Sequence, residues 1–403
     1  MPIYEGIGII NEKYPVVLEI GRYLTKAGFA GESSPRCVIP SKIKTKDAAG
    51  SRRLSDFKDS ADLYQMLVEF LHHLYCKYLL VTPKDRKVVV VESLFATTIW
   101  RQTLAKVLYL HYEVLTVLWI PSPIASVSST NQDTALIVDF GSEEVQIIPV
   151  FKGVTILCGV VCHELGADTF DKELKSILMD NCLNNSNKEE LDRCLTPAKV
   201  EDIRVRCCVV TSSSRAAQIQ RPEDITLTKF KPFLYELDGQ NFLQFHGIAR
   251  EKPSEVWFKN DDRDGISIPL MILQVLSICP VDTRKPLAAN ILITGGTGML
   301  PGLRGRLLKE LKTLTANSAD TLMNDPVLQE RFANGNYEFK MYDPPVKPNC
   351  MAWLGGTLYG ATEALGLRGI NKEFFLKHGL IPDWCDLQFD MVNANGSPVI
   401  SRG

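Results

Sequence analysis

The chain has 403 residues, of which 45% are hydrophobic, and its 45 lysines and arginines nearly balance its 47 aspartates and glutamates. That is enough apolar material for a core in two lobes, and the lack of a basic block in the sequence argues against a nucleic-acid partner. No apolar run reaches the roughly 18 residues of a membrane-spanning helix, and MPIYEGIGII has no basic region ahead of its apolar stretch, so we expect a cytoplasmic protein without direct membrane insertion.

Short apolar runs typical of buried strands alternate with stretches of helical periodicity. The strand-like runs are VVLEI, VVVVE, ALIVDF and ANILIT, and this alternation predicts an α/β fold with mixed sheets. The expected strands occupy 16–20, 88–92, 135–140 and 289–294, and the clearest expected helices occupy 61–75 and 97–109.

Two of these strands end in the same way, with an acid two residues before a glycine. The first ends in Glu19 and Gly21, the second in Asp139 and Gly141, and each is followed by another strand-like run. The repeated pattern indicates a duplicated lobe, with two hairpin turns that face each other across a cleft. Glycine there lets backbone amides approach a phosphate, and a carboxylate can hold hydrated magnesium. For either glycine taken alone, an ordinary tight turn is an equally good interpretation.

Two glycine-containing segments follow later in the chain. From Ile291 the sequence ILITGGTGMLPGLRGRLLKELKTL predicts a strand, a glycine-rich turn and an amphipathic helix, and the glycines permit close contact with a nucleotide. WLGGTL at 353–358 begins a helix of small residues, whose glycines are also explained by close packing of that helix.

Eleven cysteines are spread along the chain without a repeated frame, which predicts reduced thiols. The tightest groupings are Cys158 with Cys162 and His163, and Cys207 with Cys208. Neither has the Cys-x-x-Cys spacing of structural zinc sites. We expect no metal site in them, and interpret the cysteines as small buried apolar side chains.

Taken in order, these segments resemble actin and its relatives, from about Val16 to about Phe375. KAGFAGESSP looks like the exit of the family's first phosphate hairpin, and VDFGSEEVQIIPVFKG looks like its second hairpin. TGGTGMLPG is similar to the adenosine-binding turn, and MAWLGGTLYG to the helix that lines the groove between the lobes on the barbed face. YELDGQ and CPVDTRKPLAAN also fit. Four ordered motifs make a chance similarity very improbable.

The resemblance implies an actin-like fold, in which duplicated ribonuclease-H-like lobes surround a nucleotide cleft. The small lobe would comprise 1–125 and 350–403, with a shortened pointed-face subdomain at about 32–58. The large lobe would comprise 126–349, with a peripheral subdomain at about 166–256.

The departures from the family pattern concern the phosphate hairpins. Where actins have an aspartate and a Gly-Ser-Gly turn, this chain has Glu19, Gly21, Arg22 and Tyr23. Arg22 either pairs with a phosphate or fills the phosphate space, and the sequence leaves both possibilities open. In the second hairpin the acidic Gly-Asp-Gly turn becomes Gly-Ser-Glu at 141–143, so the affinity for magnesium should be lower.

The groups that orient water for hydrolysis in actins, a glutamine and a histidine, correspond by spacing to Ser122 and Gln146. Near the adenine, Arg204, Val205 and Leu300 replace a lysine, a glutamate and a tyrosine.

The resemblance therefore implies no enzymatic activity. ATP or ADP, with or without magnesium, would be held without turnover. Its expected contacts are Asp139, Gly141, Lys26, Gly295, Gly296 and Thr297.

Actins insert a small lobe after the first hairpin, and its loop docks in the barbed-face groove of the next filament subunit. Here RCVIPSKIKTKDAAGSRRLSDFK is too short and polar for that lobe, so the chain should receive a neighbour's loop without offering its own. The apolar plug that bridges filament strands is replaced by the hydrophilic run from Phe258 to Gly265, although a solvated loop explains that run as well. The expected groove residues are Ser128, Val154, Leu354, Leu358, Tyr359 and Thr362.

Within the family this combination is similar to the class that caps the pointed end of the short filament in dynactin. The implied partners are actin-related filament subunits at the barbed face and the small pointed-end subunits, and indirectly dynein and cargo adaptors, in the cytoplasmic cytoskeleton. Two other readings remain open. The fold also serves ATPases and sugar kinases, and nuclear relatives of actin bind a partner's helix within chromatin remodellers.

Overall fold

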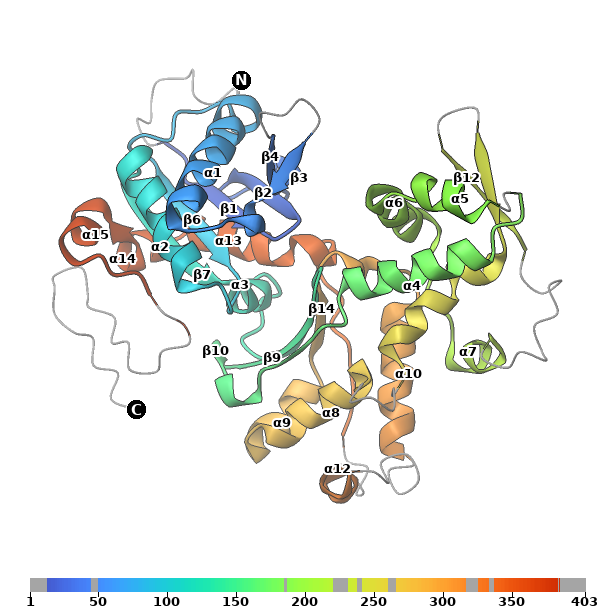
Figure 1. The fold of residues 1–403 in the computed structure, drawn as a ribbon. Helices are drawn as coiled ribbons and strands as arrows, with labels where there is room; N and C mark the ends of the chain where they lie inside the picture. Colours follow the sequence, from blue (N-terminus) through green and yellow to red (C-terminus); the bar gives the residue numbers. More distant parts are fainter. Residues whose placement is uncertain are drawn as a thin grey trace. The chain divides into compact units, whose positions relative to one another are not determined.

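A computed structural model describes residues 13–44, 50–184, 187–219, 231–237, 241–259, 266–316, 325–332, 337–382 and 384. The chain divides into two compact units, one comprising Met1–Asp133 with Cys350–Gly403 and the other Thr134–Asn349. Each unit is built on its own mixed sheet (Figure 1). Among the described residues, no helix is both long and apolar enough to cross a bilayer.

The first unit contains a six-stranded sheet in the order β15-β7-β6-β1-β2-β3. Its centre, β1, β6 and β7, is parallel, and the other pairings are antiparallel. The central strands are apolar on both faces because helices cover both, as expected for parallel strands. The strands are β1 (Val16–Ile20), β2 (Leu24–Phe29), β3 (Cys37–Pro40), β6 (Lys87–Glu92), β7 (Thr116–Pro121) and β15 (Ile370–Asn371).

Alternate residues of β1 enter two different cores. Val16 and Leu18 face the helices α1 and α2, whereas Val17 faces α13. Both α1 and α2 continue into π-helical turns at Leu74–Leu79 and Val107–His111. The helices of this unit are α1 (Ser60–His73), α2 (Thr98–Lys106), α3 (Ser122–Ser128), α13 (Met351–Ala361), α14 (Ala364–Arg368) and α15 (Lys372–His378).

Helix α13 packs against α3 at a contact that tolerates no side chain. A Cβ atom on Gly355 would lie 1.8 Å from the Ala125 carbonyl oxygen, and one on Gly356 would lie 2.4 Å from Val91 Cγ2. Trp353 is fully buried and donates from Nε1 to the Val17 carbonyl oxygen at 3.3 Å. The interpretation of these glycines as packing residues is therefore confirmed.

The second unit contains a sheet in the order β10-β9-β8-β14, with β11 also paired to β9. Helices α8 and α9 contact β9 and β8 (Figure 1). The strands are β8 (Ala135–Phe140), β9 (Val145–Phe151), β10 (Val154–Thr155), β11 (Val161–His163) and β14 (Ile291–Thr294), and the two helices are α8 (Ile268–Ile278) and α9 (Val281–Ala288).

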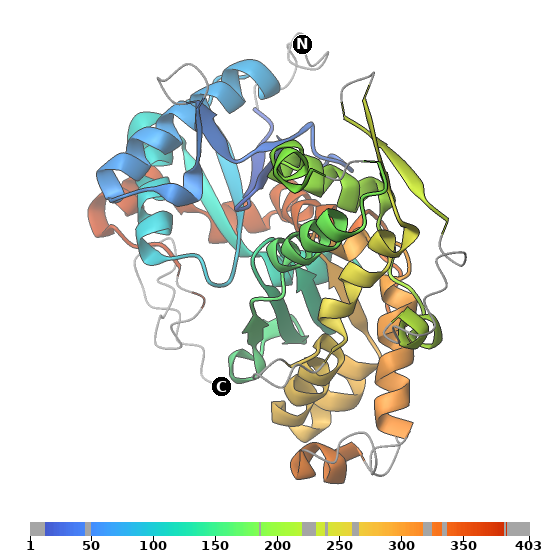
Figure 2. The ribbon, with the colours of Figure 1, turned by 45° about the vertical axis from the view of Figure 1, so that its right-hand side comes forward.

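The remaining elements of this unit are mostly helices (Figure 2). A two-stranded sheet of β12 and β13 stands apart from the main sheet. Tyr235 on β12 bonds to Asp202 on α6 at 3.0 Å, which ties that hairpin to the helices. The elements are α4 (Ala167–Asp180), α5 (Lys188–Cys194), α6 (Pro197–Cys207), α7 (Ser213–Ile219), β12 (Phe233–Glu236), β13 (Phe242–Phe245), α10 (Leu303–Ala316) and α12 (Pro326–Phe332).

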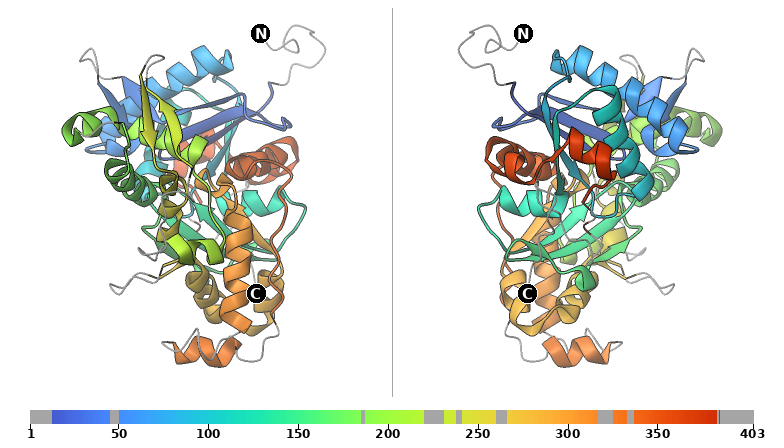
Figure 3. Two further views of the ribbon diagram at one scale, coloured as in Figure 1. Left: turned by 90° about the vertical axis from the view of Figure 1, so that its right-hand side faces the viewer. Right: turned by 90° about the vertical axis from the view of Figure 1, so that its left-hand side faces the viewer.

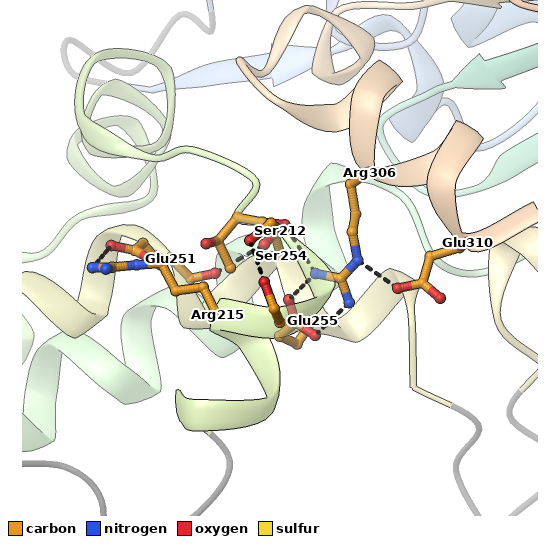
Figure 4. A network of polar contacts seen from close by, with 9 residues as sticks. Ser212, Arg215, Glu251, Ser254, Glu255, Arg306 and Glu310 are labelled. Carbon is orange, nitrogen blue, oxygen red and sulfur yellow. Dashed lines mark hydrogen bonds and ion pairs between the residues drawn. The ribbon is translucent and has the colours of Figure 1, made fainter. Parts of the chain in front are cut away.

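A buried polar network joins α7, the 3₁₀ segment Lys252–Trp257 and α10 (Figure 4). Arg306 donates to Glu255 at 3.2 and 3.3 Å, to Glu310 at 2.6 Å and to the Thr211 carbonyl oxygen at 2.9 Å. The side chains of Arg306 and Glu255 are only 5% and 3% exposed. Burial raises the pKa of the Glu255 carboxyl above its ordinary value, and Arg306 opposes that rise.

The two hairpins predicted from the repeated sequence pattern have the same register. Glu19 lies opposite Lys26 across β1 and β2, and Asp139 lies opposite Gln146 across β8 and β9. Each leading strand also has a parallel neighbour, β6 for β1 and β14 for β8. The duplicated α/β arrangement expected from the sequence is therefore present in both units.

The cysteine interpretation is correct in part. Cys208 and Cys279 are buried, but Cys158 and Cys162 are exposed, because they lie on the 3₁₀ turn Leu157–Gly159 and on β11 at the margin of the sheet. Across the described ranges, no group of three or more His, Cys, Asp or Glu side chains is placed to hold a metal ion.

Candidate functional site

The first hairpin carries its own ion pair. Lys26 Nζ on β2 contacts Glu19 Oε1 on β1, and the two side chains are 12% and 17% exposed. The second carboxylate oxygen, Glu19 Oε2, is buried and has no hydrogen-bond partner among the described residues. A buried acceptor without a hydrogen-bond donor lowers the stability of the fold unless a water or a ligand donates to it. The hairpin therefore offers an unsatisfied acceptor, and the positive charge of Lys26 is already balanced by Glu19.

Ser41, which no sequence motif marks, fixes the turn of this hairpin from the side. The Gly21 amide donates to the Leu24 carbonyl oxygen at 3.0 Å, and Ser41 Oγ donates to the Gly21 carbonyl oxygen at 2.6 Å. The Ser41 amide donates to the Tyr23 carbonyl oxygen at 2.8 Å. These bonds hold the turn in one conformation.

Tyr23, one of the two large residues in the turn, is itself a packing residue. The Arg53 guanidinium lies 4.0 Å from the centre of the Tyr23 ring, a cation–π contact. Arg22 next to it is exposed. The bulk that replaces the family's small turn residues is thus used in part to bind the segment around Arg53.

The second hairpin turn is held by the N-terminus of α4. The Gly141 amide donates to the Glu144 carbonyl oxygen at 3.1 Å, which repeats the bond in the first hairpin. Backbone amides at 166–168 donate to the carbonyl oxygens of residues 141–143 at 2.8 to 3.1 Å. A Cβ atom on Gly166 would lie 2.4 Å from the Glu143 carbonyl carbon. The first amides of α4 therefore bind the protein's own turn, and a ligand cannot use them without displacing it.

Gln146 lies on the same side of the hairpin as Asp139, since the two are directly opposed in register. Its side-chain nitrogen Nε2 donates to Glu144 Oε1 at 2.5 Å. The residue that takes the place of the family's histidine is thus engaged by a neighbouring carboxylate.

The glycine-rich turn after β14 lies against the second hairpin. Gly295 has φ of +88°, and a Cβ atom on it would lie 2.3 Å from the Phe140 carbonyl oxygen and 2.7 Å from Asp139 Oδ1. At Gly296 no described atom lies within 4 Å of the corresponding point, and Thr297 is buried. The turn therefore brings Asp139, Gly295 and Gly296 together in one unit, and leaves the Gly296 backbone open to a ligand.

The helix expected directly after this turn begins later. A 3₁₀ turn at Thr297–Met299 intervenes, and α10 starts at Leu303. Gly302 has φ of +89°, and a Cβ atom there would lie 2.0 Å from the Val210 carbonyl oxygen. Only glycine fits at this position, where the chain turns into α10. Because α10 begins after this turn, its first amides are separated from the glycine turn.

The residues predicted near the adenine have structural partners. Arg204 on α6 donates to Asp171 Oδ1 on α4 at 2.7 Å, and its side chain is 9% exposed. Burial raises the pKa of the Asp171 carboxyl, and the arginine opposes this shift. Val205 is 62% exposed, and Leu300 is buried. Arg204 therefore fastens α6 to α4.

These observations test whether the chain fits a nucleotide and magnesium. Five of the six predicted contacts, all but Lys26, lie on the second hairpin and the glycine turn, where open backbone suits a phosphate. Lys26 lies in the other unit, paired with Glu19. With Asp139 as the carboxylate beside the turn, magnesium would keep most of its waters. The glycine turn of the second unit therefore has room for a phosphate group. In the first unit, Lys26 is paired with Glu19 and does not offer an unpaired positive charge.

Most of the predicted groove residues lie on α3 and α13 of the first unit. The hydroxyls of Ser128 and Tyr359 are hydrogen-bonded at 3.0 Å, so the two helices are also joined at this end. Leu358 is 44% exposed, and Thr362 is exposed just after α13. Leu354 is half-buried. Val154 is exposed on β10 of the other unit.

The shortened segment after the first hairpin contains more strand than expected. In addition to β3 it forms β4 (Lys42–Lys44) and β5 (Ser51–Arg53), which pair with each other, whereas the sequence predicted few strand residues. Arg52 forms a bidentate ion pair with Asp62 on α1, with N–O distances of 2.5 and 2.8 Å. Asp59 caps α1 by accepting from the amides of its first turn at 2.8 and 3.0 Å. Residues 45–49 of this segment lie outside the described residues, as do 260–265 of the hydrophilic run that replaces the apolar plug and 238–240 of YELDGQ.

Comparison with known proteins identifies the family that has this architecture. Residues 10–381 match the family model described as Actin. The actin-related protein 10 of Dictyostelium discoideum is 28% identical over 435 aligned positions, which cover 93% of this chain and 90% of that protein. Because the family match spans most of the chain and agrees with the duplicated hairpins, the chain belongs to the actin family and has its fold.

Proposed function

We propose that this chain is a non-catalytic subunit that caps the pointed end of a short actin-related filament, as in dynactin. The proposal rests on how the segment between β3 and α1 is bound. The Arg52–Asp62 ion pair and the stacking of Arg53 on Tyr23 hold this segment against its own unit. Where this segment is described, at 41–44 and 50–59, it is bound to its own unit, and this favours a chain that offers no lobe to a further subunit.

The opposite role, receiving a neighbour, is supported by α13. Leu358 and Thr362 are exposed beside Tyr359, and Leu354 is half-buried one turn before Leu358. Apolar and hydroxyl groups together are typical of the core of an interface. A subunit that receives a loop and offers none ends the filament at its pointed end. The further partners would be the small pointed-end subunits, through which dynein and cargo adaptors are reached.

Two-colour microscopy of single actin-related filaments tests the capping role. At saturating concentration, the purified chain should slow pointed-end growth by about 10-fold or more and leave barbed-end growth unchanged. Leu358→Asp should abolish capping, because burying an unpaired carboxylate in an interface costs several kcal/mol. Leu367→Asp is the matched control, since Leu367 is 73% exposed on α14, outside the groove set. Subunits found on both sides of the chain, or long polymers of the chain itself, would overturn the proposal.

We propose that the second hairpin and the glycine turn of the second unit hold ATP or ADP without turnover. Gln146 takes the place of a histidine, and its amide nitrogen is already bonded to Glu144, so we expect phosphate release by the purified chain to stay at the buffer background. Asp139→Asn should change the nucleotide recovered on denaturation and leave this background rate unchanged. Steady phosphate release that disappears in Asp139→Asn would instead identify an ATPase.

A further inference from the structure

Helix α10 has two unlike faces. Leu303, Arg306, Leu307 and Leu311 are buried in the second unit. The other face borders a surface hollow of about 390 Å³, and the described residues that line it all belong to this helix. In the left-hand view of Figure 3, α10 runs down the near side of the molecule. The lining residues are Gly305, Leu308, Lys309, Lys312, Thr313 and Ala316.

The spacing of these residues follows one stripe of the helix, so the hollow extends along the axis for about 16 Å, at 1.5 Å per residue. Small residues, Gly305 and Ala316, stand at its two ends, with Leu308 between them. No described atom lies within 4 Å of a Cβ position on Gly305. A second helix can therefore approach closely and cover Leu308, as packed helices do at about 8 to 10 Å between axes.

Two lysines give this stripe its charge. Lys309 and Lys312 are exposed, and neither forms an ion pair or a side-chain hydrogen bond within the described part of the chain. The nearest acid on the helix, Glu310, instead pairs with Arg306 on the buried side. Arg304 is paired with Asp343 at 2.6 Å. The stripe thus presents two unpaired cations beside Leu308, which is half-buried because part of it packs against the core of the second unit.

We infer that the outer face of α10 is a docking surface for an acidic amphipathic helix of a partner protein. The partner's apolar stripe would cover Leu308 between Gly305 and Ala316, and its carboxylates would meet Lys309 and Lys312. The charge favours this occupant over the alternatives. Two lysines are fewer than the four to eight cations typical of an anionic membrane surface, and nucleic acid would also require more phosphate contacts. The surface uses none of the residues proposed for the filament contact.

Site-specific photo-crosslinking in the assembled complex tests this inference. With p-benzoylphenylalanine in place of Thr313, the crosslinked peptide should carry acids on one helical face and apolar residues on the other. The same probe in place of Lys188, whose side chain is 71% exposed, gives the background. No signal above that background, a lipid adduct, or a basic peptide without an apolar stripe would overturn the inference.

Two variants separate the charge from the shape of the surface. Lys309→Glu with Lys312→Glu should lower the crosslink yield at least fivefold, whereas Lys285→Glu with Lys347→Glu, which makes the same change in net charge at other exposed positions, should not. Gly305→Leu keeps both lysines and fills the hollow, so it should also lower the yield. All three are at exposed positions, so the two charge-reversed proteins should melt like the wild type and Gly305→Leu should melt no lower than it. Equal loss in both charge-reversed proteins, or full yield in Gly305→Leu, would refute the docking geometry.

Discussion

Replacing Gly355 by alanine should lower the free energy of unfolding of the first unit by about 3 kcal/mol. The added Cβ would lie 1.8 Å from the Ala125 carbonyl oxygen, which is backbone and cannot rotate away. Helices α3 and α13 would have to move apart, and α13 would lose its contact with the sheet at Gly356 and Gly360. Thermal unfolding should show a midpoint lower by roughly 6 to 12 °C.

Gly366→Ala is the matched control for this prediction. Gly366 lies within α14, and no described atom is within 4 Å of its Cβ position. Alanine there relieves the conformational entropy cost of glycine in a helix, so stability should rise by roughly 0.5 kcal/mol. If both substitutions had similar effects, close packing at Gly355 would not be the reason for glycine at that position.

Arg306→Met should lower the free energy of unfolding of the second unit by about 3 to 5 kcal/mol, because it leaves the Glu255 carboxylate buried without its cation. The carboxylate is 3% exposed, and α10, α7 and the Lys252–Trp257 segment all depend on the network (Figure 4). Chemical denaturation followed by the fluorescence of Trp257, which is fully buried, measures the change.

The pH dependence of this variant follows from the pKa of Glu255. Burial already raises that pKa above its ordinary 4.5, and losing Arg306 removes the main group that opposes the rise. A carboxyl whose folded pKa is raised favours the folded state below its unfolded pKa and loses that contribution as pH rises through the folded pKa. The defect of Arg306→Met should thus be largest near pH 8 and shrink as pH falls toward 4.5. Adding Glu255→Leu should recover most of the stability at pH 8, and no recovery would contradict the buried-charge explanation.

The apolar runs predicted the strands well because each run is long enough to be buried on both faces of a sheet. β1 and β8 have the predicted bounds, and β6 and β14 differ from the prediction by two residues or fewer at either end. The repeated acid and glycine also predicted the two hairpins, since a tight turn needs a glycine at one fixed place and the register follows from it. Family membership followed from the order of these motifs.

Other contacts could not be predicted, because their partners are far apart in the chain. Nothing near Ser41 in the sequence indicates that its hydroxyl holds the turn at Gly21. Gly166 did carry a signal, a glycine directly before a helix, but its role depends on the carbonyl oxygens of residues 141–143. The strands β4 and β5 were missed because their residues are polar, and they form through pairing with each other and through the contact of Arg53 with Tyr23.

The sequence by itself determined the α/β class and the duplicated hairpins, because both depend on residue type and local spacing. Only the tertiary structure decided which groups remain available. It pairs Lys26 with Glu19, engages Gln146 with Glu144 and binds the amides of α4 to the second hairpin turn. The physical reason is that hydrogen bonds and ion pairs saturate, and which partner satisfies a group depends on distances in three dimensions.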